Sequence, residues 1–313
     1  MPGTGGLPLA ALLPSWELSL AERDLSPRTV EVYQRTGKQL TAWLTGHGLP
    51  ADTEGIGAPH LRAFLAAERE RTSAVSAHQH YRNLRVLFRW LEREGERQGP
   101  NPMARVDPPK VTKKTKAILS ADDLGKLLKG CGGQDFESRR DAAILRIFID
   151  TGVRVSGLAG LRYLPEAPED SDVNLPGKAV RVILKGGNQH WAPLGRKAAA
   201  ALDRYLRARL RHRLAGSPWL WLGMAGRDPS HFGTAGIQDM IERRGEEAGL
   251  GKISPHWFRR TAAHSMLALG YQETDVASIA GWTGTAMVRL YAGELAAERA
   301  RAVHARLSPG DQI

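Results

Sequence analysis

The sequence predicts a mostly α-helical protein with one small antiparallel β-sheet, divided into an all-helical front domain and a mixed α+β rear domain. Three observations support this fold class. Apolar residues recur at helical spacing throughout residues 1–105. Short extended segments flank a Gly-rich turn at 185–188, within an otherwise helical second half. Between the halves, residues 106–116 contain two prolines and four lysines, a composition typical of an extended, soluble linker.

Four helices are expected in the front domain, residues 1–105. Pro14 should lie in the first turn of the first helix, where a residue without an N–H costs nothing. Ser26-Pro27 should begin the second helix, and the third should run over 58–71. The inner face of the second helix is predicted to consist of Val30, Tyr33, Leu40, Trp43 and Leu44.

The fourth helix has the clearest pattern in the chain. Ser73 can cap it. Its apolar face falls at i, i+3, i+4 and i+7 and consists of Leu84, Leu87, Phe88 and Leu91. A separate stripe consists of Arg82, Arg85, Arg89 and Arg93. In a neutral protein such a stripe would be interpreted as a solvated surface. Because this chain has a large net positive charge, contact with DNA phosphates is an equally good interpretation.

Residues 106–119 are expected to form a basic interdomain linker, and its lysines, including Lys113 and Lys114, could also lie along a DNA backbone. The rear domain, residues 120–313, should begin with a helix capped by Ser120. An apolar helix over 142–149 should end near Thr151-Gly152. Short strands are expected at 161–163, 179–184 and 189–193, with the turn 185–188 joining the last two.

The remainder of the rear domain is expected to be helical. Helices are predicted at 196–214, 234–248, 256–269, 273–280 and 285–291. Residues 294–307 should form a detached amphipathic tail helix.

Composition restricts the class of partner and compartment. The chain has 313 residues, enough for one large domain or two ordinary ones. Its 44 Lys and Arg against 33 Asp and Glu give a net charge of +11, which points to a polyanion, with nucleic acid ahead of a membrane surface. The single cysteine, Cys131, excludes an intrachain disulfide and a Cys-based zinc site and fits a reducing cytoplasm. No apolar run is long enough to cross a membrane, and the first residues lack a signal peptide's basic region.

Several side chains form a set that suits attack on a phosphodiester. The negative oxygens of a phosphodiester repel nucleophiles, so catalysis requires positive charge fixed beside them. Arg154 and Arg259 suit that role because a guanidinium can hold two oxygens at once. Lys185, in a flexible turn, could protonate a leaving oxygen. His256 lies one helical turn before Arg259 and could accept a proton or bond the phosphate.

Trp282 and Tyr291 complete this set. The indole N–H of Trp282 can only donate a hydrogen bond, for example to a phosphate oxygen. Tyr291 is the candidate nucleophile, and its phenol requires a base or nearby positive charge to ionise. Taken singly, each of these residues has an ordinary structural interpretation, and only the combination indicates chemistry. The set includes no cluster of carboxylates, so we expect neither a metal nor another cofactor.

These residues occur in four ordered motifs that resemble the tyrosine recombinase (phage integrase) family, of integrase or Xer type. The family's first arginine motif resembles Thr151-Gly152-Val153-Arg154, and its hairpin lysine resembles Lys185. Its His-x-x-Arg motif resembles His256-Trp257-Phe258-Arg259. Its Leu-Gly-His motif, with the nucleophile nine residues later, resembles Ala280-Gly281-Trp282 followed by Tyr291. The front half also resembles the family's helical core-binding domain, so the resemblance covers nearly the whole chain.

The resemblance implies a SAM-like core-binding domain followed by a catalytic domain of the DNA breaking-rejoining type. It implies a site-specific recombinase that cleaves double-stranded DNA through a 3′-phosphotyrosyl bond without metal or ATP. A cut by one tyrosine severs one strand, so the working unit should be a homotetramer on two DNA sites. We expect a monomer in free solution, because the apolar strip of the tail is small.

The chain departs from the family at a few positions. Gly157 stands where the family usually has Glu or Asp, which supports the active site. Arg260 and Trp282 replace histidines that are common in the family, and 164–177 lengthens the gap between Arg154 and Lys185. Gly157 favours a second hypothesis, a catalytically weak or inactive DNA-binding accessory protein of the same fold. The sequence leaves open the DNA target and the choice among integration, dimer resolution and inversion.

Overall fold

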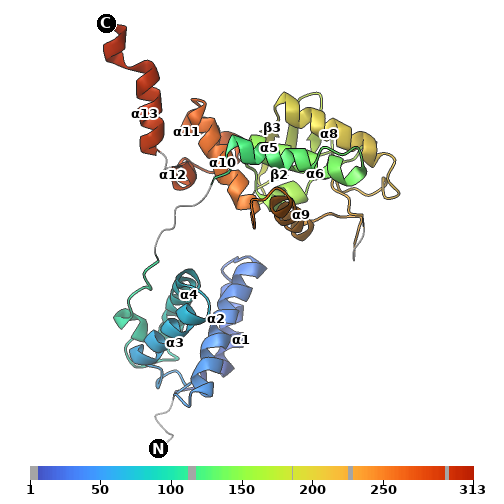
Figure 1. The fold of residues 1–313 in the computed structure, drawn as a ribbon. Helices are drawn as coiled ribbons and strands as arrows, with labels where there is room; N and C mark the ends of the chain where they lie inside the picture. The colour runs from blue at the N-terminus through green and yellow to red at the C-terminus, as the bar shows by residue number, and fades with distance from the viewer. Residues whose placement is uncertain (1–5, 112–117, 185, 225–227, 293–295) are drawn as a thin grey trace, which may run out of the picture. The chain divides into compact units, whose positions relative to one another are not determined.

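The computed structural model describes residues 6–111, 118–184, 186–224, 228–292 and 296–313 (Figure 1). The chain divides into two compact units, Met1–Lys114 and Thr115–Ile313. Lys113, Lys114 and the other residues of 112–117, in the expected linker, lie outside the described residues. None of the helices in the described ranges is both long and apolar enough to cross a membrane.

Over its described residues, 6–111, the front unit consists of four helices and a short 3-10 turn, η1. Their bounds are α1 (Leu9–Ala21), α2 (Pro27–Gly46), α3 (Ala58–Arg71), α4 (Ala74–Arg93) and η1 (Pro102–Arg105). The predicted caps are confirmed: the Ser26 hydroxyl accepts from the Thr29 N–H at 3.3 Å, and the Ser73 hydroxyl accepts from the Ser76 N–H at 3.1 Å. The predicted face of α4 is fully buried against α2 and α3.

The prediction for Pro14 is wrong, because α1 begins at Leu9 and contains Pro14 in its interior. A proline inside a helix costs about 3 kcal/mol through its missing hydrogen bond. Starting the helix earlier buries Leu9, Leu12 and Leu13 on the same side as Trp16. Each buried leucine contributes roughly 1.5–3 kcal/mol, so burial outweighs the cost of the proline.

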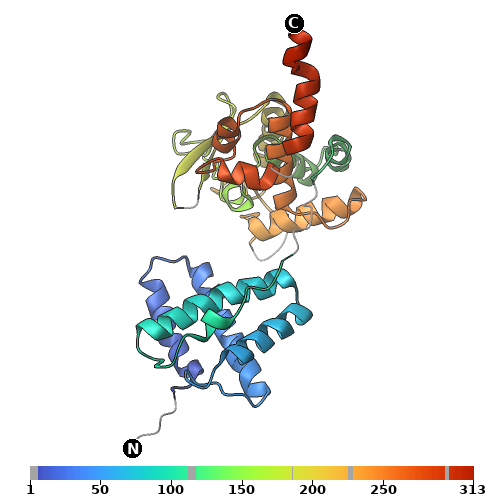
Figure 2. The same ribbon diagram turned by 90° about the vertical axis from the view of Figure 1, so that its left-hand side faces the viewer.

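The rear unit places a three-stranded sheet among helices. In chain order its elements are α5 (Ala121–Gly130), α6 (Phe136–Thr151), α7 (Val155–Ala159), β1 (Val173–Asn174), β2 (Ala179–Ile183), β3 (Gln189–Pro193), α8 (Arg196–Arg209), α9 (Thr234–Glu247), α10 (Pro255–Ala268), α11 (Glu273–Ile279), α12 (Ala286–Ala292) and α13 (Ala296–Leu307), followed by η3 (Pro309–Gln312). The sheet is antiparallel in the order β1-β2-β3, and Ile183 pairs with Gln189 at the hairpin end. The hairpin lies at the edge of the unit (Figure 2). The expected fold class, mostly α with a small antiparallel sheet, is confirmed.

Two boundaries in the rear unit differ from the predicted ones. Residues 161–163 do not join the sheet; Arg162 forms an isolated bridge with Trp219, and β1 takes the third place in the sheet. Helix α8 ends at Arg209 rather than at 214. The buried guanidinium of Arg209 donates to the carbonyls of Ala215, Ser217, Trp219 and Leu220, so the chain after α8 folds back around it.

Helix α6 forms the centre of the rear unit. Its buried residues, including Ile144, Ile147 and Phe148, pack against α8 and α10. The helix begins at Phe136, earlier than the predicted 142, because the Asp135 carboxylate caps it by accepting from the Ser138 N–H at 2.9 Å. Helices α10, α11 and α12 pack together at the other end of α6 and carry a small apolar cluster of their own.

Candidate active site

The candidate active site begins where α6 ends. The Thr151 hydroxyl donates to the carbonyl of Ile147 at 2.6 Å, and Gly152 ends the helix in the left-handed conformation, with φ of +60°. A side chain at Gly152 would place its Cβ 3.0 Å from the Cβ of Ala262, so α10 packs directly against this turn. Arg154 follows at the N-cap of α7, with an exposed side chain. Because Gly152 has no side chain, α10 can pack closely against the turn that leads to Arg154.

Arg259 joins three segments that are distant in sequence. It lies on α10 with only 3% of its surface exposed. Its guanidinium donates to the carbonyl of Gly152 and, at 3.4 Å, to that of Ala280. The guanidinium carbon also lies 4.5 Å from the centre of the Trp282 ring, within the range of a cation–π contact. These contacts hold the guanidinium in place between the end of α6 and the connection from α11 to α12.

His256 and Trp282 lie at opposite sides of Arg259 in the sequence and differ in environment. His256 occupies the first turn of α10 and is exposed, whereas Trp282 lies between α11 and α12 and is buried. Trp282 thus falls in the gap between the predicted helices 273–280 and 285–291. Gly281 just before it adopts φ of +63°, which lets the chain turn sharply after α11.

The hairpin of β2 and β3 packs on this same turn. A Cβ at Gly281 would lie 2.7 Å from Cδ2 of Leu184 and 3.1 Å from Cδ2 of His190. The imidazole of His190 also forms a 3.1 Å hydrogen bond with the carbonyl of Ile279. Lys185 itself lies outside the described residues, whereas Leu184 just before it packs against the turn at Gly281.

His190 was not singled out by the sequence analysis. A lone histidine in a short strand carries no motif, and only the hairpin pairing reveals that it faces α11. Tyr291 lies in α12, which packs against α10 and α11 with Val288 fully buried. The side chain of Tyr291 lies outside the described residues. The structure therefore brings Arg154, Arg259 and Trp282 to one region and places α12 beside it.

Gly157 lies in α7 against the sheet. A Cβ there would be 3.3 Å from the Cβ of Val182 and 3.6 Å from the carbonyl oxygen of Ile183. A larger side chain at this position would therefore start in close contact with β2 and would require Val182 to shift slightly. A metal site is not evident either, because no group of three or more His, Cys, Asp or Glu gathers within the described ranges.

The arginine stripe of α4 is exposed, as a DNA-contacting surface would require. Arg82, Arg85 and Arg89 all face solvent. The Arg85 guanidinium lies 5.9 Å from the Tyr81 ring centre, and Arg85 and Arg89 line a pocket of about 520 Å³ beside η1. The other two candidate DNA-binding residues, Lys113 and Lys114, lie outside the described residues.

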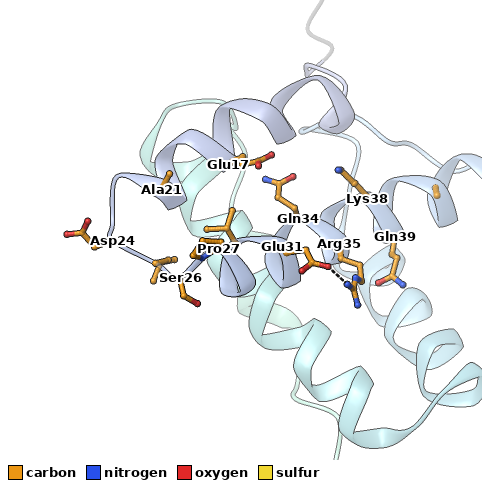
Figure 3. Close-up of a pocket in the computed structure, with 13 residues that line it drawn as sticks. Glu17, Ala21, Asp24, Ser26, Pro27, Glu31, Gln34, Arg35, Lys38 and Gln39 are labelled. Atoms are coloured by element: carbon orange, nitrogen blue, oxygen red, sulfur yellow. Dashed lines mark hydrogen bonds and ion pairs between the residues drawn. The ribbon is translucent and has the colours of Figure 1, made fainter. Parts of the chain in front are cut away.

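A larger pocket, of about 990 Å³, lies between α1 and α2 of the front unit (Figure 3). Its rim carries charges of both signs, including Glu17, Glu31, Arg35 and Lys38. Glu31 pairs with Arg35 at 2.5 Å across one helical turn. The candidate active site lies in the other unit.

Comparisons with known proteins agree on one family. Residues 117–298 match the model of the phage integrase family, and residues 15–95 match that of the phage integrase N-terminal SAM-like domain. The tyrosine recombinase XerD of Pseudomonas aeruginosa is 30% identical over 292 residues, covering 92% of this chain and 93% of that one. The tyrosine recombinase XerC of Pseudomonas entomophila is 28% identical and covers 86% of each chain.

Solved structures show the same fold at lower identity. A lambda integrase fragment (75–356), solved as a dimer bound to a core site, gives a TM-score of 0.70 at 19% identity, covering 90% of this chain and 94% of that one. The XerH recombinase bound to a palindromic difH substrate gives a TM-score of 0.71 at 16% identity, covering 90% of this chain and 81% of that one.

Proposed function

The chain belongs to the phage integrase family, and we propose that it is a site-specific DNA recombinase that cleaves and rejoins strands through a phosphotyrosine bond. The observation that carries the proposal is the meeting of motifs around Arg259. Its guanidinium contacts the glycine of the first arginine motif and the segment that holds Trp282. The hairpin of Lys185 packs on that segment as well.

In the proposed reaction the phenol oxygen of Tyr291 attacks the scissile phosphorus. The bond from phosphorus to the 5′ oxygen breaks while the bond to tyrosine forms, leaving a 3′-phosphotyrosyl strand and a free 5′-hydroxyl. His256 accepts the phenol proton or bonds the phosphate, and Lys185 protonates the departing oxygen. Attack by a 5′-hydroxyl from the partner duplex reverses these steps and rejoins the DNA. The phosphodiester energy is kept in the tyrosyl bond, so neither ATP nor a metal is needed.

Arg154, Arg259 and Trp282 would donate to the non-bridging oxygens as negative charge builds up. Donors fixed before the reaction stabilise the transition state without reorganising during it. The buried, multiply bonded Arg259 suits this role, because its position is determined by the fold rather than by the substrate. Arg154, exposed at the start of α7, suits a position against the DNA backbone.

The larger assembly is also part of the proposal. The helical front unit and the catalytic unit, joined by the basic linker, would close around duplex DNA, with Arg82, Arg85, Arg89, Lys113 and Lys114 on phosphates. Four protomers would act on two sites, whereas the free protein is a monomer in the cytoplasm. Helix α13 has no buried side chain, which supports a role for it in contacting a neighbouring protomer.

A suicide substrate tests the proposed chemistry. A DNA site nicked next to the scissile phosphate releases a short strand upon cleavage and traps the protein covalently. We expect the wild-type chain to form this adduct in the presence of EDTA. The Tyr291→Phe variant should bind the same DNA equally well and form none, because it lacks only one oxygen atom. An adduct from the Phe variant at normal yield would move the nucleophile elsewhere, to Tyr271 first.

The same experiment decides the second hypothesis, a DNA-binding accessory protein without catalysis. The observation in its favour is Gly157, which packs against β2 and stands where the family usually has an acidic residue. Tight site-specific binding by the wild-type chain with no adduct at any pH would establish that alternative. The named recombinases among the relatives favour the enzyme.

A further inference from the structure

A basic pocket of about 490 Å³ lies on the rear unit, away from the candidate active site. It is formed by the loop between α5 and α6, by α6 as far as Arg146, and by α8, which packs along α6 (Figure 1). Three arginines line it: Arg139 and Arg146 from α6, and Arg204 from α8. The candidate active site begins at the opposite end of α6, at Gly152.

The charge of this pocket is not balanced by the protein. Within the described part of the chain, no carboxylate lines it, and none of its three guanidinium groups has an ion pair or a hydrogen bond. Nearby carboxylates are engaged elsewhere: Asp135 caps α6, Glu137 pairs with Arg140 and Arg243, and Asp203 pairs with Arg207.

The neighbouring arginines show that this domain does pair its buried cations. Arg140, next to Arg139 in the chain, is bound to Asp141 at 2.9 Å. Arg243 and Arg244 share the same Asp141 at 3.1 and 2.8 Å. The three arginines of the pocket differ from these: Arg139 and Arg146 are half-buried, Arg204 is exposed, and their unpaired charges are open to an anion from outside the chain.

The geometry and the remaining lining also favour an anion. Arg139 and Arg146 are seven residues apart on α6, or about 10 Å along its axis. The N-terminus of α6 is already capped by the Asp135 carboxylate, so the positive charge of the pocket comes from its three guanidinium groups. Burial raises the pKa of the Cys131 thiol in the pocket wall to about 11, so this group stays neutral near pH 7.

We propose that this pocket is a phosphate-binding site distinct from the active site, which takes a ligand with more than one phosphate group. Guanidinium groups bind phosphate oxygens in pairs, and the separation of Arg139 from Arg146 suits two successive phosphates better than one. Such a ligand comes either from a nucleic-acid strand or from a free polyphosphate. The inference does not depend on strand cleavage and stands or falls separately from the proposed function.

Residue-resolved labelling tests the site in the intact protein. The full chain is treated with phenylglyoxal, which modifies exposed guanidinium groups, and the rate at each arginine is measured by peptide mass spectrometry. The probes are inorganic pyrophosphate and a duplex DNA of random sequence. At a probe concentration about ten times Kd, the labelling of Arg139, Arg146 and Arg204 should slow about tenfold. Protection by DNA identifies a strand as the ligand, and protection by pyrophosphate alone identifies a free polyphosphate.

Arg211, exposed just beyond α8 and outside the pocket, is the internal control. Unchanged labelling of the pocket arginines with both probes, or equal protection of Arg211, would overturn the proposal. A variant pair gives a second measurement. Thermal stabilisation by whichever probe protects the pocket, pyrophosphate or the random duplex, should be lost in Arg139→Gln/Arg146→Gln/Arg204→Gln and kept in the charge-matched Arg162→Gln/Arg207→Gln/Arg211→Gln. Equal stabilisation of the two triple variants would also overturn it.

Discussion

Arg154 and Arg259 are both proposed to stabilise the transition state, but Arg154 is exposed and Arg259 is buried. Substitution of each should therefore separate an effect on the cleavage rate from an effect on the stability of the fold. Either residue replaced by alanine should slow cleavage of the nicked substrate by about a hundredfold or more, the cost of losing one fixed transition-state donor. Only Arg259→Ala should also destabilise the fold. It leaves the carbonyls of Gly152 and Ala280 without this donor, at about 1–3 kcal/mol for each buried group.

Single-turnover cleavage and thermal unfolding of both variants measure these effects. Arg154 makes no side-chain cap to α7, so Arg154→Ala should unfold at the wild-type temperature. An equal loss of stability in the two variants would contradict the difference in environment. Normal cleavage by either variant at saturating protein would reduce that arginine to an anchor for DNA.

Cys131 gives a prediction about alkaline pH. Burial raises the pKa of its thiol from 9.0 to about 11 in the folded protein. The unfolded chain loses this proton first, so the stabilising contribution is complete below pH 9 and is lost as the pH rises toward 11. The full difference between the two pKa values is worth about 3 kcal/mol. Cys131→Ala should remove this part of the loss of stability at alkaline pH. The free energy of unfolding in urea, measured at pH 8.5 and 10.5, checks this. Equal losses in the wild-type and variant proteins would show that folding does not shift the pKa of the thiol.

At the scale of elements, the docking of the hairpin on the turn after α11 should control catalysis. Gly281→Ala places a methyl group where Leu184 and His190 now pack, in a left-handed conformation that alanine disfavours by about 1–2 kcal/mol. We expect cleavage to slow more than duplex binding, since the displaced hairpin carries Lys185. Gly284→Ala is the matched control, because nothing lies within 4 Å of its Cβ position. If Gly281→Ala cleaves at the wild-type rate, the packing of the hairpin on this turn does not control catalysis.

Elements with local signals could be predicted from the sequence, and those set by distant contacts could not. The caps at Ser26, Ser73 and Ser120 are read from a few adjacent residues, and each one forms its expected hydrogen bond. The interior position of Pro14 depends on apolar burial against α2, and the end of α8 depends on carbonyls gathered around Arg209. The two-residue strand β1 has no periodicity to detect.

The same distinction applies to the candidate site. The types of its residues and their order can be predicted from the sequence, because each motif is short and contiguous. The sharing of Arg259 between Gly152 and Ala280, and the contact of His190 with Ile279, join residues that are far apart in the chain. No local pattern encodes such pairs, so the sequence could nominate the participants but not their contacts.

At the scale of the whole molecule, α13 is the proposed link between protomers. Truncation after residue 293 should leave the binding of one protein to one half-site unchanged, because none of the side chains of α13 is buried in its own domain. Cooperative binding to the full site should decrease, which gel-shift titrations of half and full sites would measure. Recombination at the wild-type rate by the truncated protein would exclude α13 as the coupling element.

The contacts of Arg259 also bear on when the protein becomes active during its own synthesis. A ribosome makes the turn at Gly152 first, the arginine itself later, and the segment of Ala280 and Trp282 last of the three. A nascent chain that already carries the whole front unit still lacks the surroundings that hold this guanidinium. The proposed capacity to cut DNA should therefore arise later in translation than the folded front unit.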